Sequence, residues 1–209
     1  MRRIVIQTLC WVLVVLPIGS VIEAAGRQVS DTTQAGSNPQ VIIEMDSGAE
    51  IVLELDPHVA PNTVRNFLSL GGSGFYDGLV FHRVIPGFMI QGGDPEGTGR
   101  GGPGYAIPGE FKANGFPNDL VHERGVISMA RSRHPDSAGS QFFIMVAAAP
   151  HLDGHYAAFG HVVSGMDEVD RIVSVPRSTA DRPLADQRIA RVTVETFGVE
   201  YAEPEVIRR

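Results

Sequence analysis

The residues best suited to chemistry lie together in the stretch FHRVIPGFMIQGGD, at positions 81–94. Arg83 supplies a guanidinium donor, Gln91 an amide, Met89 a thioether and Phe88 an aromatic ring. Any one of these residues alone is typical of a protein core or of a solvated strand. Four such groups within a few positions, beside glycine-dense loops, favour a functional site that works by apolar contact and hydrogen bonding.

Covalent, metal and dinucleotide chemistry find weaker support. No serine lies in a G-x-S-x-G turn, and the single cysteine, Cys10, lies in the apolar N-terminal segment. His151 and His155 have a spacing that could bind zinc on a helix, but a neighbouring proline and glycine favour a loop, and no third ligand is near. The run GTGRGG at 97–102 matches a dinucleotide-binding pattern, yet the prolines after it exclude the required helix. We expect no metal and no cofactor.

Four blocks of sequence carry a resemblance to a known family. They are FHRVIPGFMIQGGD at 81–94, VISMAR at 126–131, GSQFFI at 139–144 and HLDGHYAAFGHV at 151–162. Through them, residues 41–196 resemble the cyclophilin-type peptidyl-prolyl cis-trans isomerases, and among these the bacterial members with signal sequences. The resemblance implies an enzyme that accelerates rotation about X-Pro peptide bonds during protein folding, with neither a covalent intermediate nor a cofactor.

The resemblance also implies roles for individual residues. It makes Arg83 the catalytic donor to the prolyl nitrogen, and Gln91 the amide that orients this arginine and contacts the rotating carbonyl. The backbone at 130–131 is expected to pair with an extended substrate. The substrate-binding residues that it implies are Phe88, Met89, Ala130, Arg131, Gln141, Phe143, His151, Leu152 and Tyr156.

Three positions depart from the family's pattern. His151 stands where many members carry a tryptophan that supports cyclosporin binding, so we expect weak cyclosporin binding or none. Tyr156 aligns with a pocket-lining histidine of the eukaryotic members. Arg131 replaces a common asparagine, and segment 132–138 is one residue longer than in the eukaryotic version. We expect backbone recognition to tolerate these changes and substrate preference beyond proline to shift.

The elements that must position these residues are mostly short strands. Apolar positions three and four apart predict helices from Pro61 to Gly72 and over 166–173. Between 71 and 109, glycine and proline are too dense for a long helix. Apolar runs bounded by turn residues predict strands at 41–45, 51–55, 79–84, 88–91, 125–130, 141–146, 156–163 and 189–197. This mainly β pattern predicts a closed eight-stranded antiparallel β-barrel capped by two short α-helices.

The N-terminus has the features of a targeting segment. Two arginines precede an apolar run at 4–22, and small residues follow it. This order is typical of a secretory signal peptide, and the run is also long enough to stay in place as a membrane anchor. We therefore expect an exported protein, periplasmic or otherwise extracytoplasmic, and leave cleavage open. The expected parts are a signal or anchor at 1–25, a flexible linker at 26–39, the isomerase domain at 40–198 and a C-terminal extension at 199–209.

Composition narrows the range of partners. The chain has 209 residues, is 43% hydrophobic, carries a formal net charge of -7 and contains a single lysine, Lys112. This balance argues against a nucleic-acid surface, and one cysteine cannot form an internal disulfide. We expect a monomer whose partners are X-Pro peptides and unfolded or partly folded proteins. Two alternatives stay open: a chaperone or scaffold module that binds proline-containing segments without a significant isomerase role, and a barrel that carries a small ligand.

Overall fold

Residues 37–208 of the chain are described by a computed structural model. The predicted signal or anchor at 1–25 and the linker up to residue 36 lie outside these described residues, so both stay predictions. Within 37–208, no helix is both long and apolar enough to cross a membrane.

Eight strands and two α-helices alternate with long loops in this part of the chain. The strands are β1 (Gln40–Met45), β2 (Glu50–Leu55), β3 (Arg83–Ile85), β4 (Met89–Gly92), β5 (Val126–Met129), β6 (Phe142–Met145), β7 (Ala158–Ser164) and β8 (Ile189–Glu195). The helices are α1 (Pro61–Gly72) and α2 (Met166–Val173), with short 3-10 turns η1 (Lys112–Asn114) and η2 (Pro150–Leu152). Both predicted α-helices are confirmed, and each predicted strand has a counterpart within a few residues.

The first hairpin shows how the sequence sets the sheet. In β1, Val41, Ile43 and Met45 are buried while the residues between them are partly exposed, as alternation along a strand requires. β2 repeats this pattern, and the two strands pair antiparallel with Ile43 opposite Ile51. Gly48 in the connecting turn has a φ of 80°, a conformation that glycine adopts without steric cost.

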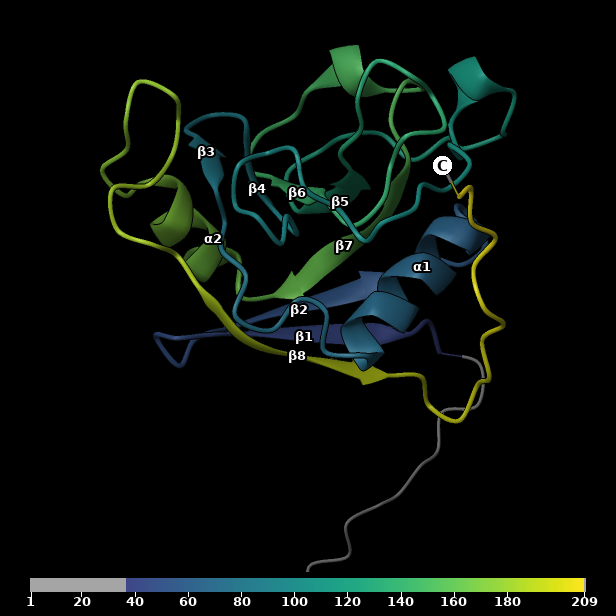
Figure 1. Cartoon of the computed structure of the whole chain (residues 1–209), viewed down its shortest axis with the longest axis horizontal. Helices are drawn as coiled ribbons and strands as arrows, with labels where there is room; N and C mark the ends of the chain where they lie inside the picture. The colour runs from purple at the N-terminus through teal and green to yellow at the C-terminus, as the bar shows by residue number, and fades with distance from the viewer. Residues whose placement is uncertain (1–36, 209) are drawn as a thin grey trace, which may run out of the picture. The chain divides into compact units, whose positions relative to one another are not determined.

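The strands form one curled antiparallel sheet in the order β3-β4-β6-β5-β7-β2-β1-β8 (Figure 1). The closed barrel predicted from the sequence is not found, because the sheet is a half-barrel with β3 and β8 at its edges. An isolated bridge between Val80 and Arg188 and a few backbone hydrogen bonds join these edges in place of a continuous ladder. The cause is local. The predicted strand at 79–84 pairs regularly only from Arg83, so β3 is three residues long.

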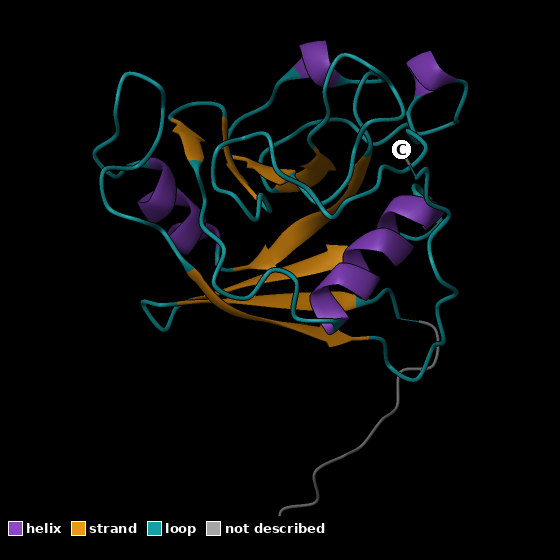
Figure 2. Ribbon diagram, in the orientation of Figure 1, coloured by secondary structure: helices purple, strands orange, loops and turns teal. Residues whose placement is uncertain are grey.

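Helix α1 packs against the sheet beside β8, and α2 lies near β2, β3 and β4 (Figure 2). Pro61 occupies the first turn of α1, where its missing N–H costs nothing. The next two N–H groups, of Asn62 and Thr63, donate to the carboxylate of Glu110 at 2.9 and 2.7 Å. A buried carboxylate from a distant loop therefore satisfies the helix N-terminus and complements its dipole.

The two faces of the sheet near β4 and β6 serve different purposes. Ile90 and Ile144 belong to the main core, where α1 contributes Phe67 at 5.3 Å from the ring of Phe142. Their chain neighbours point the other way, so that Met89 joins a second, smaller apolar cluster. Strand alternation thus assigns one face to stability and the opposite face to the site described below.

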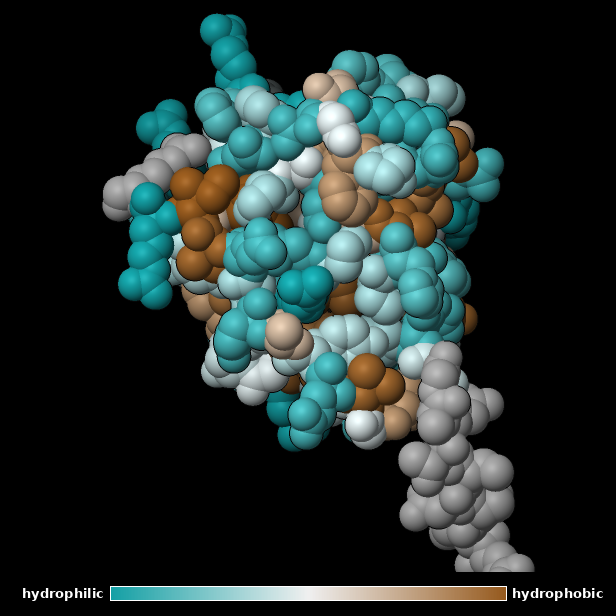
Figure 3. All heavy atoms as spheres, turned by 90° about the vertical axis from the view of Figure 1, so that its right-hand side faces the viewer, coloured by the Kyte–Doolittle hydropathy of each residue, from teal (hydrophilic) through white to brown (hydrophobic). Residues whose placement is uncertain are grey.

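Figure 3 shows one face of the surface, on which apolar groups gather in separate patches with polar residues between them. Among the described residues, the large hydrophobic side chain with the greatest exposure is Leu184, at 72%. Scattered apolar side chains of this kind are normal on a folded surface and need no partner to cover them. The expected monomeric state stays a prediction.

Candidate functional site

Nine of the eleven residues expected at the site line one cavity of about 210 Å³. The cavity opens between β3, β4, the end of β5, β6 and the loop that includes η2. The lining residues are Arg83, Phe88, Met89, Gln91, Ala130, Arg131, Phe143, Leu152 and Tyr156. The remaining two lie beside it, since Gln141 lines an adjoining pocket and the ring of His151 stacks on Phe88 at 5.8 Å.

The floor of the cavity is apolar. Met89 on β4 and Phe143 on β6 are 2% and 5% exposed, and Leu152 in η2 is 7% exposed. Tyr156 stands edge-on to Phe143, with ring centroids 5.9 Å apart. Aromatic and thioether groups of this kind offer large contact areas to a small apolar ring.

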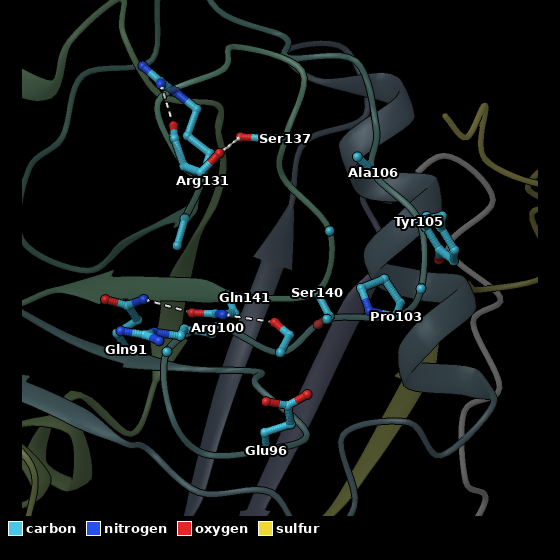
Figure 4. Close-up of a pocket in the computed structure, with 17 residues that line it drawn as sticks. Gln91, Glu96, Arg100, Pro103, Tyr105, Ala106, Arg131, Ser137, Ser140 and Gln141 are labelled. Atoms are coloured by element: carbon cyan, nitrogen blue, oxygen red, sulfur yellow. Dashed lines mark hydrogen bonds between the residues drawn. The ribbon is translucent and has the colours of Figure 1, made fainter. Parts of the chain in front are cut away.

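Arg83 lies exposed at the rim of the cavity and is oriented by a chain of amides. It is paired across the β3–β4 ladder with Gln91, and its Nη1 donates to Gln91 Oε1 at 3.3 Å. Gln91 Nε2 donates to Gln141 Oε1 at 3.0 Å, and Gln141 Nε2 donates to the carbonyl of Gly101 at 2.9 Å (Figure 4). Within residues 37–208, the other guanidinium donors of Arg83 have no hydrogen-bond acceptor. They can therefore serve a ligand in the cavity.

A buried polar network lies directly behind the aromatic floor. His122 and Ser128 are 1% and 0% exposed, and His122 stacks on Phe143 at 6.0 Å. His122 Nδ1 lies 2.9 Å from Asp153 Oδ1, and its Nε2 lies 3.0 Å from Ser128 Oγ. Although Ser, His and Asp are in contact, Ser128 cannot reach a substrate, so the network supports the floor and is not a nucleophilic site.

Burial sets the protonation state of this network. It lowers the pKa of His122 below its usual range, against the opposing effect of Asp153. Burial raises the pKa of Asp153, but hydrogen bonds from His122 outweigh it, and the net shift is downward. An ionised carboxylate only accepts hydrogen bonds, so Nδ1 of the neutral His122 ring carries the proton and Ser128 Oγ donates to Nε2. Sequence analysis did not find this network: Ser128 and Asp153 lie in two of the recognised blocks, but His122 lies outside all four, and Asp153 is 31 residues from His122 in the chain.

Arg131 contributes more than the backbone contact expected of it. Its guanidinium lies 4.6 Å from the ring centroid of Tyr156 and 5.0 Å from that of Phe111. Its Nε and Nη2 donate to the carbonyl of His155 at 3.1 and 2.8 Å. Arg131 therefore packs on Tyr156 by cation–π contact and anchors the loop that carries it.

A second pocket of about 660 Å³ adjoins the first and shares Gln91, Ala130 and Arg131 with it (Figure 4). Part of its wall is formed by residues 99–102 of the glycine-rich run at 97–102, and this run contains no helix, as the prolines predicted. Asp94, 1% exposed, holds this loop by accepting N–H donors from Glu96 at 2.8 Å and from Arg100 at 3.0 Å. The run thus forms part of the wall of the larger pocket.

Known proteins resemble this chain over the same region. The family model for cyclophilin type peptidyl-prolyl cis-trans isomerases matches residues 40–194. Peptidyl-prolyl cis-trans isomerase B of Bacillus subtilis is 52% identical over 123 residues, which cover 59% of this chain and 82% of that protein. A peptidyl-prolyl cis-trans isomerase of Synechococcus elongatus is 49% identical over 144 residues, covering 65% of this chain and 94% of that protein.

A solved structure shares the fold. It is a crystal structure of a cyclophilin type peptidyl-prolyl cis-trans isomerase from Cryptosporidium parvum in the presence of the dipeptide Ala-Pro. Its TM-score with this chain is 0.68 at 34% sequence identity, and the match covers 75% of this chain and 99% of that one. The family match runs from the first residue of β1 into β8 and includes every strand and loop that lines the small cavity. The chain belongs to the cyclophilin-type peptidyl-prolyl cis-trans isomerase family.

Proposed function

We propose that this chain accelerates rotation about X-Pro bonds by holding the proline ring in the 210 Å³ cavity while Arg83 donates a hydrogen bond to the twisted prolyl nitrogen. The observation that carries this mechanism is the position of Arg83, which is exposed at the rim of an apolar cavity and oriented by Gln91. The Cryptosporidium relative, whose structure was solved with Ala-Pro present, supports a proline-containing ligand.

The reaction requires selective stabilisation of a strained amide. Amide resonance creates a rotation barrier of about 18–20 kcal/mol, and no covalent bond has to be made or broken. As the prolyl nitrogen loses conjugation it becomes pyramidal and basic, so a hydrogen bond to it strengthens only in the twisted state. A donor that binds the transition state better than either ground state lowers the barrier. Arg83 has donors for this purpose, and Gln91 lies beside it to contact the carbonyl that rotates.

The rest of the proposal follows from the surroundings of the cavity and from the N-terminal sequence. The clients are proline-containing peptides and partly folded chains, which the backbone at 130–131 binds by main-chain pairing. His151, where many family members carry a tryptophan, is expected to leave cyclosporin binding weak. Because of the signal-like segment at 1–25, we place the protein outside the cytoplasm.

A peptide assay tests the mechanism at Arg83. Cis-trans exchange of an Ala-Pro-Phe peptide is measured with the purified chain, with Arg83→Ala, and with Arg65→Ala as a matched control. Arg65 lies on α1 and lines a different groove. We expect Arg83→Ala to lose at least about tenfold in kcat/KM, equivalent to about 1.4 kcal/mol of transition-state stabilisation, and Arg65→Ala to keep the parent rate.

The same assay separates the enzyme from the alternative binding module. If the folded parent binds the peptide without accelerating exchange, the isomerase mechanism is wrong, and a chaperone or scaffold role takes its place. If Arg83→Ala keeps full activity, the reaction stands but its assignment to Arg83 is wrong. Circular dichroism spectra of all three proteins establish that they are equally folded before the rates are compared.

A further inference from the structure

The charges around the two pockets are unevenly distributed. Three arginines line them, namely Arg83, Arg100 and Arg131, against one carboxylate, Glu96. The chain as a whole has a formal net charge of -7. The two adjoining pockets, called the groove below, therefore form a locally positive surface on an acidic protein. Such a surface attracts ligands of negative charge.

The arginines inside and outside the groove also differ in whether they form ion pairs. Away from the groove, many described arginines are paired with carboxylates: Arg124 with Asp170, Arg171 with Glu168, Arg177 with Asp181, Arg188 with Asp186 and Arg191 with Glu44. Within residues 37–208, no groove arginine has such a partner. Arg83 donates to an amide, Arg131 donates to backbone carbonyls, and the Arg100 side chain has no hydrogen-bond acceptor.

Arg100 lines the larger pocket, which shares Gln91, Ala130 and Arg131 with the smaller one. Its backbone N–H is held by Asp94 at 3.0 Å, which fixes the loop from which the side chain extends. Figure 4 draws Arg100 and Gln91 among the residues that line this pocket, and Gln91 also accepts a hydrogen bond from Arg83. Two guanidinium groups, those of Arg100 and Arg131, thus line the larger pocket. A carboxylate bound between them would be attracted by both positive charges.

We infer that Arg100 is a specificity-determining residue that selects X-Pro substrates carrying an acidic side chain close to the proline. The inference rests on the proposed function and adds a substrate class to it. Because Gln91 and Ala130 line both pockets, a peptide whose proline fills the smaller pocket must pass the larger one. An extended chain advances about 3.3 Å per residue. The side chain one or two residues from the proline therefore reaches the larger pocket, where Arg100 meets its carboxylate.

Glu96 places a negative charge in the same pocket as Arg100. Its side chain lines the same pocket, is turned toward Thr98 Oγ1 at 3.5 Å and opposes the field of Arg100. Removing this carboxylate should strengthen the preference for acidic peptides, whereas reversing the charge at Arg100 should abolish or invert it. The two changes move the preference in opposite directions, which a merely structural role of either residue does not predict.

Peptides that differ only in charge provide the test. Glu, Gln or Lys is placed one or two residues from proline, on either side, and kcat/KM is measured for each peptide with the full chain at low salt. We expect the Glu peptide to exceed its Gln counterpart by about fivefold at one position or more, the upper range for exposed charge pairs. The ratio should approach one in about 0.5 M salt. It should rise in Glu96→Gln and fall below one in Arg100→Glu.

Arg65→Glu makes the same change in net charge outside the site and should leave the ratio unchanged. Equal ratios for the Glu and Gln peptides at all positions, or equal effects of Arg65→Glu and Arg100→Glu, overturn the inference. Titration of the same peptides measures the preference in binding without catalysis. Preferred binding of the Glu peptide with no isomerisation of any peptide would keep Arg100 as the selector and overturn the proposed function instead. Isomerisation of all the peptides without a charge preference would support the proposed function and overturn the role of Arg100.

Discussion

A single exposed arginine makes a poor catalyst if its guanidinium is free to rotate, because fixing a long side chain costs about 1.5–2 kcal/mol of rotamer entropy. In this chain, hydrogen bonds within the protein already orient Arg83 without a bound ligand. Gln91 accepts from Arg83, Gln141 accepts from Gln91, and the chain of amides ends on the backbone carbonyl of Gly101. Each amide accepts at its oxygen and donates at its nitrogen, so fixing the last amide of the chain fixes the orientation of the others.

This chain of amides predicts an effect of Gln141, which is outside the small cavity. Gln141→Met keeps the length of the side chain but can neither accept from Gln91 nor donate to Gly101. We expect kcat on an Ala-Pro peptide to fall by about three- to tenfold with little change in KM, since the proline pocket is intact and only the orientation of Arg83 is lost. Gln91→Met should give a similar loss, and the double variant should lose little more than either single variant. Fully additive losses would contradict the coupling.

At this scale, sequence analysis found the residues that line the cavity and the amide that orients Arg83, and missed the buried network behind the apolar floor. Strand alternation predicts that Met89 and Gln91 share a face, whereas Phe88 was assigned to the site through the family resemblance alone. Ser128, His122 and Asp153 meet only because β5, its preceding loop and η2 come together. The side-chain role of Arg131 was missed for a similar reason, because Phe111 and Tyr156 are far from it in sequence.

At the scale of elements, the buried network joins the loop before β5 to the loop after η2 behind the pocket floor. His122 accepts from Ser128 on β5, and both its ring and its backbone N–H contact Asp153. His151 is the other titratable group that acts on His122, and it also lowers the pKa of His122. The geometry of the floor therefore depends on a histidine that stays neutral.

This dependence gives a pH profile of known sign. The folded pKa of His122 lies below its value of about 6.5 in unfolded chains, so the unfolded state binds a proton that the folded state does not. The resulting stability is complete above about pH 6.5 and is lost as the pH falls toward the folded pKa. We expect the free energy of unfolding in urea to decrease from about pH 7.5 to pH 5.5, by at most about 1.4 kcal/mol per pH unit for this group.

Two substitutions assign the pH effect. His122→Gln removes the titrating ring, so its stability should depend less on pH than that of the parent, whatever its absolute loss. His82→Gln is the comparison variant. His82 too is buried, and burial lowers its pKa, but neither of its ring nitrogens has a hydrogen-bond partner among the described residues. Both variants should flatten the profile, and only His122→Gln should also impair peptide binding. A parent profile that rises toward acid would refute the scheme.

Local sequence patterns predicted the individual helices and strands well, but they did not predict whether the barrel closes. The helix predicted from Pro61 to Gly72 forms with these bounds, since a first-turn proline and terminal glycines are local signals. Barrel closure depends on whether the two sheet edges can meet, and no local pattern encodes that. The capping of α1 by Glu110 is likewise a contact between segments 48 residues apart.

At the scale of the whole molecule, the C-terminal extension joins parts of the fold that are distant in sequence. Beyond the family match, Glu205 exchanges two hydrogen bonds with the side chain of Asn62 on α1, at 2.7 and 3.0 Å. Ile207 then exchanges two backbone hydrogen bonds with Ala106, at 2.7 and 3.0 Å. Ala106 lines the larger pocket and is next to Ile107, which bridges to Ala138. The extension thus adds an isolated β-bridge to one wall of the larger pocket.

Breaking this bridge should loosen the wall of the larger pocket without unfolding the core. Ile207→Pro removes the N–H that donates to Ala106, whereas Ile207→Ala shortens the side chain and keeps the donor. With a net value of about 0.5–1.5 kcal/mol for one hydrogen bond, we expect Ile207→Pro to lower the free energy of unfolding by about this amount and Ile207→Ala by less. The KM for peptides that extend into the larger pocket should rise in Ile207→Pro, while the KM for the minimal Ala-Pro peptide should stay near the parent value. Equal stability and equal KM values in the two variants would show that the extension lies on the fold without supporting the groove.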